Sequence, residues 1–302
     1  MNKKQEYIGW IFMGKMFEAL QKAEDENVRT PQAETVEPSL DNDTVFDDNL
    51  VCHFQSNSIV SEQFRKLRTY LFMPALGAKP KTILMTSAVS GEGKSLIAIN
   101  LAITIAKELH SHALLMDCDL RNPSLSRWFG VNKAKGLSDY LVGNSELPDL
   151  LIKTGIDKLN ILPGGDSQEN PAELIGSKKM EGLIDELKSR YSDRHIILDS
   201  SPVLATTEPQ VLYKVVDCII LVVRAGVTPR GSVQQAIKFL GKEKIVGVVL
   251  NDMNFRSAAL RSRYFGTSRY YPYYGSDNND KNQNFGSKFN SIFKKKQREQ
   301  HK

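Results

Sequence analysis

The side chains best suited to chemistry lie in residues 86–95, between the apolar runs 82–85 and 96–99. These runs predict a strand before the stretch and a helix after it. Gly91 and Gly93 allow the backbone to turn tightly and to point its N–H groups at phosphate oxygens. Lys94 is placed to reach the β- and γ-phosphates of a nucleotide, and the Ser95 hydroxyl suits Mg²⁺. We therefore predict a loop that binds ATP and Mg²⁺, formed by Ser90, Gly91, Glu92, Gly93, Lys94 and Ser95.

The loop departs at one position from the usual G-x-x-x-x-G-K-[ST] pattern, because Ala88 stands where the first glycine belongs. The alternative is a glycine-rich turn that only precedes an ordinary helix. The order strand, Gly-Lys-Ser, helix favours the nucleotide loop, since the start of the helix adds the positive end of its dipole.

Three aspartates follow apolar runs in the same way. Asp117 and Asp119 come after residues 114–116, and Asp199 comes after residues 196–198. Acids at alternate positions leave a strand on the same side. At the ligand-binding edge of a parallel sheet, the three would face Mg²⁺ and the γ-phosphate. Each acid alone could instead cap the next helix, but three of them beside the loop favour a catalytic site.

One further polar residue ends a predicted strand. Asn251 follows residues 248–250, and its amide could hydrogen-bond the adenine base. The same residue could as easily stop the strand, so both interpretations stay open.

The elements around these residues alternate along the chain. We predict strands at 82–87, 113–118, 159–162, 195–199, 217–223 and 245–250. Helices are expected at 59–72, 94–109, 124–129, 137–142, 171–190, 208–215 and 229–241. Continuous apolar strands indicate a sheet that is buried on both faces. The predicted fold is therefore α/β, with a doubly wound and mostly parallel sheet of the P-loop NTPase type, similar to that of partitioning ATPases.

The 302 residues allow one large α/β domain plus tails. We expect an amphipathic segment at 1–23, an acidic linker at 24–57, the nucleotide-binding domain at 58–254 and a disordered tail at 255–302. The tail carries +8 and the first 254 residues carry −3. A basic tail favours anionic membrane surfaces, nucleic acid or acidic partners, although charge that only keeps the tail soluble explains it equally well.

The same sequence excludes several classes of protein. It has no run of eighteen apolar residues and no signal-peptide pattern at its start. Cys52, Cys118 and Cys218 lack the spacing of a metal site or a disulfide framework. We therefore expect a protein of the reducing cytoplasm.

Several of these motifs together resemble those of one family. Asp117-x-Asp119-x-Arg121 resembles the Walker A′ motif of bacterial tyrosine kinases, which are P-loop kinases of capsule and exopolysaccharide synthesis. Glu62-x-x-Arg65-x-x-Arg68 is similar to the oligomerisation motif of that family, although such a stripe by itself is usually a solvated helix face. Segments 162–165 and 170–175 are similar to a family segment as well. A terminal tyrosine cluster completes the resemblance, which covers about 59–274: Tyr264, Tyr270, Tyr271, Tyr273 and Tyr274.

The resemblance implies a kinase that phosphorylates its own tyrosine tail between subunits of a ring. It also implies a transmembrane chain-length determinant protein as activator, a cognate tyrosine phosphatase, and a place at the inner face of the plasma membrane. In the expected mechanism Lys94 holds phosphate charge, Asp119 and Asp199 lie near Mg²⁺ with Ser95, and Asp117 accepts the tyrosine proton.

Two alternatives from other classes stay open. A partitioning or cell-division ATPase on DNA or membrane shares the Gly-Lys-Ser loop, but it typically has a lysine early in the loop, where residues 87–90 have none. A non-catalytic scaffold would not need the full set of acids. We expect no nucleic-acid partner, and the tyrosine cluster could also be an aromatic linker.

Overall fold

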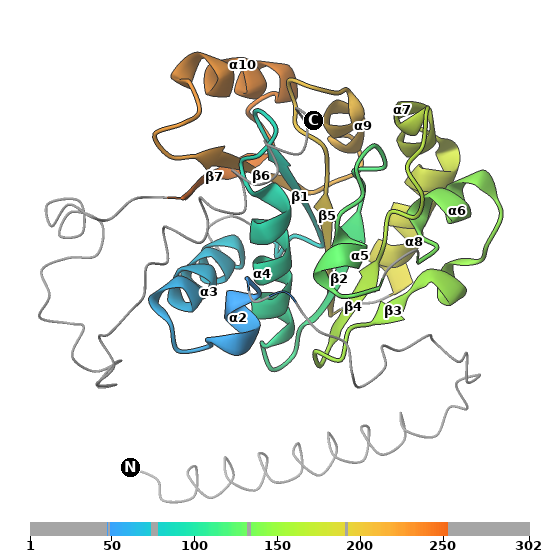
Figure 1. The fold of residues 1–302 in the computed structure, drawn as a ribbon, viewed down its shortest axis with the longest axis horizontal. Coiled ribbons are helices and arrows are strands. Elements are labelled where there is room, and N and C mark those ends of the chain that lie inside the picture. Colours follow the sequence, from blue (N-terminus) through green and yellow to red (C-terminus); the bar gives the residue numbers. More distant parts are fainter. Residues whose placement is uncertain (1–46, 48, 74–77, 132–133, 191–192, 253–302) are drawn as a thin grey trace, which may run out of the picture. The chain divides into compact units, whose positions relative to one another are not determined.

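The computed structural model describes residues 47, 49–73, 78–131, 134–190 and 193–252. They form a seven-stranded sheet in the order β3-β4-β2-β5-β1-β6-β7, which runs through the centre of Figure 1. Neighbouring strands are parallel, except that β3 and β4 are antiparallel. The strands are β1 (Thr82–Ser87), β2 (His112–Asp117), β3 (Ile152–Lys153), β4 (Leu159–Leu162), β5 (Arg194–Asp199), β6 (Cys218–Arg224) and β7 (Ile245–Asn251).

Successive side chains of the central strands enter two different hydrophobic cores. In β1, Leu84 belongs to one core, whereas Ile83 and Met85 belong to the other. This alternation follows from the two-residue period of a strand, and it shows that both faces of the sheet are covered. The predicted doubly wound, mostly parallel sheet is therefore confirmed.

One core is built around α4 (Lys94–Ala106), whose residues from Ile97 to Ala106 are all buried. A helix that is apolar all round must be covered on every side. The sheet covers one side of α4, and further helices cover the rest, as Figure 1 shows. These helices are α2 (Val51–Phe54), α3 (Ile59–Leu71) and α5 (Leu125–Trp128).

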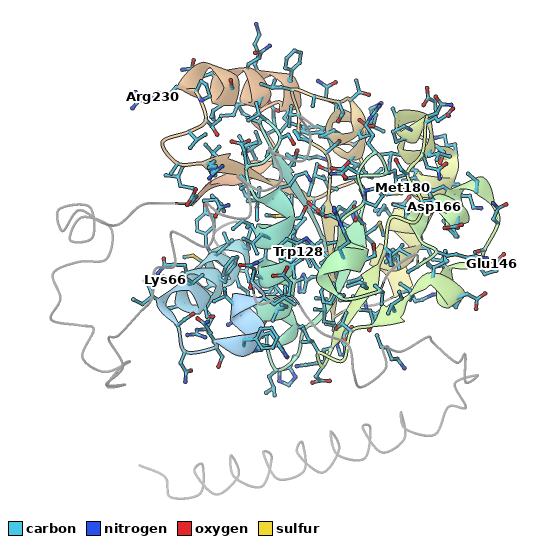
Figure 2. All side chains as sticks on the ribbon, in the orientation of Figure 1. Lys66, Trp128, Glu146, Asp166, Met180 and Arg230 are labelled. Carbon is cyan, nitrogen blue, oxygen red and sulfur yellow. The ribbon has the colours of Figure 1, made fainter. Side chains whose placement is uncertain are left out.

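The second core lies on the opposite face of the sheet, where α-helices of the described residues and a short 3₁₀ helix cover it. The α-helices are α6 (Leu137–Val142), α7 (Pro171–Ile175), α8 (Lys178–Arg190), α9 (Glu208–Leu212) and α10 (Arg230–Leu240). The 3₁₀ helix, η2 (Leu147–Leu150), lies between α6 and β3. In Figure 2 the charged side chains of Lys66 on α3 and Arg230 on α10 lie at the outside of the ribbon.

Three expectations about the elements need correction. The helix predicted at 171–190 is two helices, because Gly176 ends α7 before α8 begins at Lys178. The short elements β3 and η2 were not predicted. The folded part of the chain also begins before residue 58, since α2 lies inside the expected linker. Leu50 and Cys52 are buried there, and Cys52 N–H donates to Asn100 Oδ1 at 2.9 Å.

Other expectations fall outside the described residues. They are the amphipathic segment 1–23, most of the linker, and the tail with its five tyrosines. Among the residues that the model describes, no helix has the length and apolar character needed to cross a membrane.

Candidate active site

The predicted nucleotide loop lies between β1 and α4, as expected. Gly91 and Gly93 have φ angles of 82° and 86°, a left-handed conformation that other residues adopt only with strain. A Cβ atom on Gly93 would overlap Asn251 Nδ2, so a side chain there would displace the Asn251 amide from its hydrogen bond to the Glu92 carbonyl. Ala88 is fully buried, which explains why a small apolar residue is accepted at the position of the first glycine. Ser90 and Gly91 are exposed at the tip of the loop.

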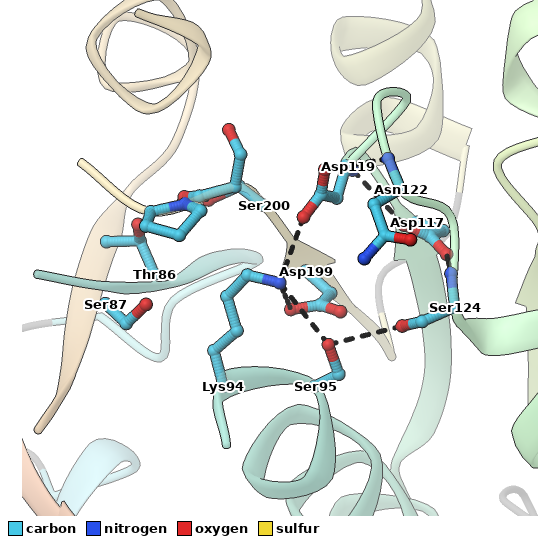
Figure 3. Close-up of polar contacts among 12 residues, drawn as sticks. Thr86, Ser87, Lys94, Ser95, Asp117, Asp119, Asn122, Ser124, Asp199 and Ser200 are labelled. Carbon is cyan, nitrogen blue, oxygen red and sulfur yellow. Dashed lines mark hydrogen bonds and ion pairs between the residues drawn. The ribbon is translucent and has the colours of Figure 1, made fainter. Parts of the chain in front are cut away.

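Lys94 joins the loop to two of the three predicted acids. Its Nζ atom lies 3.1 Å from Asp119 Oδ2 and 4.0 Å from Asp199 Oδ1, as the dashed lines in Figure 3 show. Burial by itself lowers the pKa of Lys94, but the charges of Asp199, Asp119 and Asp117 outweigh burial, so the pKa is raised. The Lys94 side chain therefore carries a positive charge at the carboxyl edge of the sheet, where a polyphosphate can bind.

Asp199 is the acid best suited to a metal ion. It is fully buried, and neither carboxylate oxygen has a hydrogen-bond partner of ordinary geometry in the part of the chain that the model describes. Burial raises the pKa of Asp199, although Lys94 and the Ser95 hydroxyl favour its charged form. An unsatisfied buried carboxylate is costly unless a ligand completes it.

The residues present fit Mg²⁺ on this ground. Carboxylate oxygens from Asp119 and Asp199 and the hydroxyl of Ser95 are the hard oxygen ligands that Mg²⁺ prefers. Ser124 Oγ lies 3.3 Å from Ser95 Oγ at the same place. No group of three His, Cys, Asp or Glu side chains with metal-binding geometry occurs in the described ranges. Phosphate oxygens and water would therefore have to complete the shell, as is usual for nucleotide-bound Mg²⁺.

Asp117 also lies at this edge, but its geometry does not support the general-base role that we expected. Its Oδ2 atom accepts backbone N–H groups from Ser124 at 2.7 Å and Leu125 at 2.9 Å, and its Oδ1 atom accepts that of Asp119 at 3.2 Å. The residue is fully buried. Burial, followed by the charge of Asp199, raises the pKa of Asp117 to about 7. The carboxyl group caps α5 and shapes the following loop, which is the alternative left open for a strand-end aspartate.

The Asp117 loop, residues 117–124, packs against the segment 162–165. A Cβ atom on Gly164 would lie 2.9 Å from Pro123 Cβ and 3.5 Å from Asp117 Cγ. Glycine is therefore required at this point by close packing. The structure thus gives a physical reason for the Leu-Pro-Gly-Gly string at 162–165, which the sequence offered only as a resemblance.

Glu92 and Asn251 stabilise the nucleotide loop through hydrogen bonds to other parts of the protein. The Glu92 carboxylate is buried and accepts hydrogen bonds from Val89 N at 2.8 Å, from Arg224 N at 3.2 Å and from the Thr228 hydroxyl. Asn251 Nδ2 donates to the Glu92 carbonyl oxygen at 2.9 Å. Glu92 was predicted to bind the cofactor as part of the loop, and the Asn251 amide was predicted either to bind adenine or to end the strand. The contacts that the structure shows for both side chains are with the protein.

Arg121 and Glu208 form a contact that sequence reasoning missed. Arg121 Nε donates to Glu208 Oε1 at 2.9 Å, and the Glu208 side chain is only 2% exposed. The sequence singled out Arg121 as part of a motif but gave no signal for Glu208, which lies 87 positions later.

The predicted oligomerisation residues lie on α3. Arg65 Nε pairs with Glu62 at 2.7 Å, and both side chains are partly exposed. Arg68 instead turns inward, where its Nη1 atom donates to the Thr104 carbonyl of α4 at 2.9 Å. The expected tyrosine sites lie outside the described residues.

Known proteins with similar sequences and structures include tyrosine kinases. The chain is 32% identical over 221 residues to the tyrosine-protein kinase YwqD of Bacillus subtilis, a match that covers 72% of this chain and 92% of YwqD. The solved chimerical protein CapA2B2 has a TM-score of 0.64 and 31% identity, covering 76% of this chain and 98% of its own. The kinase domain of the Escherichia coli tyrosine kinase ETK has a TM-score of 0.65 and 26% identity, covering 71% and 84%.

No family model matches the chain. The identity to YwqD extends over nearly all of that protein. The alternatives of a partitioning ATPase and of a non-catalytic scaffold are therefore set aside. The chain belongs to the bacterial tyrosine-protein kinases, and it is a nucleotide-binding enzyme with a P-loop fold.

Proposed function

We propose that this kinase transfers the γ-phosphate of ATP, with Mg²⁺, to the tyrosines of its own C-terminal tail, and that the transfer occurs between subunits. The observation that carries the proposal is the approach of Lys94 to Asp119 and Asp199 beside a left-handed glycine loop. The acceptors would be the clustered tyrosines: Tyr264, Tyr270, Tyr271, Tyr273 and Tyr274.

Each residue at the site has a distinct task in phosphoryl transfer. Lys94 and the loop N–H groups hold the charge of the β- and γ-phosphates. Ser95, Asp119 and Asp199 would hold Mg²⁺, which neutralises charge that develops on the phosphate oxygens when it is bound. Because the transition state of phosphoryl transfer is loose, placement of these groups contributes more than covalent chemistry does.

The acceptor proton does not require a strong base at the start of the reaction. A phenol has a pKa of about 10, and in a loose transition state its proton leaves late. The buried Asp117 is therefore proposed to shape the site, whereas Asp119, at 7% exposed, is the carboxylate more open to an incoming phenol. If Asp117→Asn keeps the loop shape and the rate, this assignment is supported. A rate that follows an ionisation near pH 7, and that Asp117→Asn abolishes, would restore the base role.

Features outside the active site support assembly into a ring and binding to a partner chain. The partly exposed Glu62–Arg65 pair is available on α3 for a neighbouring subunit of a ring. The similar protein CapA2B2 is a chimera, which supports a second chain as partner. We infer a transmembrane chain-length determinant protein as activator at the inner face of the plasma membrane, a tyrosine phosphatase that resets the tail, and control of exopolysaccharide or capsule synthesis and chain length.

One experiment tests the central claim. The purified full-length chain and its Lys94→Met variant are incubated with ATP and Mg²⁺, and phosphotyrosine is measured by blot and mapped by mass spectrometry. We expect phosphate on the tail tyrosines of the wild type and none on the variant. When the Lys94→Met variant is mixed with an active chain that lacks the tail, the active chain should phosphorylate the tail of the inactive one. Phosphorylation only within single chains would contradict transfer between subunits.

A further inference from the structure

The contact between Arg121 and Glu208 joins two segments that each carry a proposed Mg²⁺ ligand. Arg121 follows Asp119 by two residues, and Glu208 begins α9, nine residues after Asp199. Glu208 Oε1 accepts from Arg121 Nε at 2.9 Å. The other oxygen, Oε2, is buried and has no hydrogen-bond partner among the residues described. Burying a carboxylate with a single partner costs free energy, so stability alone does not account for the pair, and a role in positioning the site explains it better.

The segment before Glu208 is fastened to the base of the nucleotide loop. Ser200 N donates to Met85 O at 3.0 Å, Val203 N to Ser87 O at 2.8 Å, and Leu204 N to Ala88 O at 3.1 Å. The position of Glu208 is therefore set by β1 and by the first residues of the loop.

Asp119 itself is held by few contacts. Its carboxylate pairs with Lys94 and accepts the N–H of Asn122 at 3.3 Å. The neighbouring carbonyls of Leu120 and Arg121 accept from Gln168 N at 3.0 Å and Ser167 Oγ at 2.7 Å, which tie the loop toward the 162–168 side. Toward the Asp199 segment, Cys118 N donates to Asp199 O at 2.7 Å before Asp119, and Lys94 lies between the two carboxylates. After Asp119, the Arg121–Glu208 pair is a further side-chain contact to the same segment.

We propose that Glu208 is a positioning residue that acts through Arg121. It fixes the Asp119 loop against the Asp199 segment, so that the two carboxylates keep the separation that the nucleotide and its metal ion need. The inference deepens the proposed function and depends on it, because it takes Asp119 as a working part of the site. Changes in residues that orient metal ligands typically cost about 10–100-fold in activity or metal affinity.

The test compares Glu208→Gln with a matched control. Glutamine keeps the size of the side chain but removes its charge. Glu181 also stands in the first turn of a helix and pairs with Lys178 at 2.8 Å, but it lies on the exposed part of α8, so Glu181→Gln is the control. Arg121→Gln and the double variant show whether the two residues act as a unit. Asp119→Asn reports separately on the proposed function.

Two quantities are measured on the full-length protein. The first is the initial rate of tyrosine autophosphorylation as a function of ATP. The second is hydrogen exchange, without nucleotide or metal, of peptides that span residues 117–125. We expect Glu208→Gln to lower the rate at saturating ATP about tenfold, with the KM for ATP within about twofold. Exchange in 117–125 should be faster than in the wild type, and the double variant should be no slower in catalysis than the worse single variant.

Each outcome decides between the two claims. If Glu208→Gln behaves like Glu181→Gln in both measurements, the positioning role is wrong even if Asp119→Asn is inactive. If Asp119→Asn keeps the wild-type rate, the proposed metal role fails, whatever Glu208 does. Should Glu208→Gln not fold, Arg121→Lys replaces it, since lysine keeps the charge but loses the Nε contact. Unchanged exchange in 117–125 of that variant would then overturn the inference.

Discussion

The buried carboxyl of Asp117 makes the stability of the nucleotide-free protein depend on pH. Its pKa is raised to about 7 from an ordinary value of 3.8, first by burial and then by the charge of Asp199. Between pH 3.8 and about 7, the folded state therefore keeps a proton on Asp117 that the unfolded state has released. Its contribution is fully present below pH 3.8 and is lost as the pH rises through 7. Asp117→Asn removes this titration.

The size of the effect follows from the shift. Each pH unit between the two pKa values changes the free energy of unfolding by about 1.4 kcal/mol. From pH 5 to pH 8, the wild type should lose about 3 kcal/mol more stability than Asp117→Asn does, because two of these pH units lie below the folded pKa of about 7. Asp199 is also shifted upward, and its charge is one cause of the Asp117 shift, so the difference between the two proteins reports on the titration of the pair.

The assay is urea unfolding at pH 5, 6, 7 and 8, without nucleotide and with a chelator. An exposed carboxyl on α8 supplies the control, because Asp185→Asn should follow the wild type at every pH. A difference between wild type and Asp117→Asn that stays constant from pH 5 to 8 would refute the reasoning. It would mean that Asp117 is ionised in the folded protein throughout this range.

Three further changes test other parts of the structure. Gly93→Ala forces a side chain onto a φ of 86° and toward Asn251, so nucleotide affinity should fall at least about tenfold in calorimetry, while an unchanged affinity would contradict the loop geometry. Glu92→Gln leaves one of the N–H groups that donate to this side chain unpaired, and should lower the free energy of unfolding in urea by about 1–3 kcal/mol. A change below about 0.5 kcal/mol, which is the scatter of surface substitutions, would contradict the stabilising role of Glu92. Glu62→Lys should reduce the assembly size by light scattering with the melting temperature unchanged, and an assembly of wild-type size would remove Glu62 from the interface.

Much of the fold could be predicted because its strands are buried on both faces. Such strands appear in the sequence as apolar runs, and polar residues mark their ends at the ligand edge. Asp199 and Asn251 are two examples, and the predicted ends of β1 and β4 agree with the structure. The approach of Asp119 and Asp199 to Lys94 followed from the same rule, since the carboxyl ends of parallel strands share an edge.

What the sequence did not predict depends on contacts between distant residues. The four-residue helix α2 is too short to show a periodic pattern, and it is held by Asn100 of α4. The burial of Glu92 depends on Arg224 and Thr228, which come more than 130 positions later. The neighbours of Glu92 in the sequence, Gly91 and Gly93, do not indicate that its side chain points into the protein and away from the nucleotide site. The full burial of Asp117 could not be predicted either, because spacing shows the direction of a side chain but not its accessibility.

The hydrogen bond from Asn251 to the nucleotide loop also determines where the segment that leads to the proposed acceptor tyrosines starts. Asp252 leaves the sheet beside the chain's own loop, and Tyr264 follows twelve residues later. Twelve extended residues span about 40 Å, and a short tether gives an effective local concentration in the millimolar range. The length of the segment between Asp252 and Tyr264 therefore does not by itself prevent a chain from phosphorylating its own tail. Mixing an inactive full-length chain with an active chain that lacks the tail separates the two routes, because transfer between subunits of an assembled ring is also first order in protein.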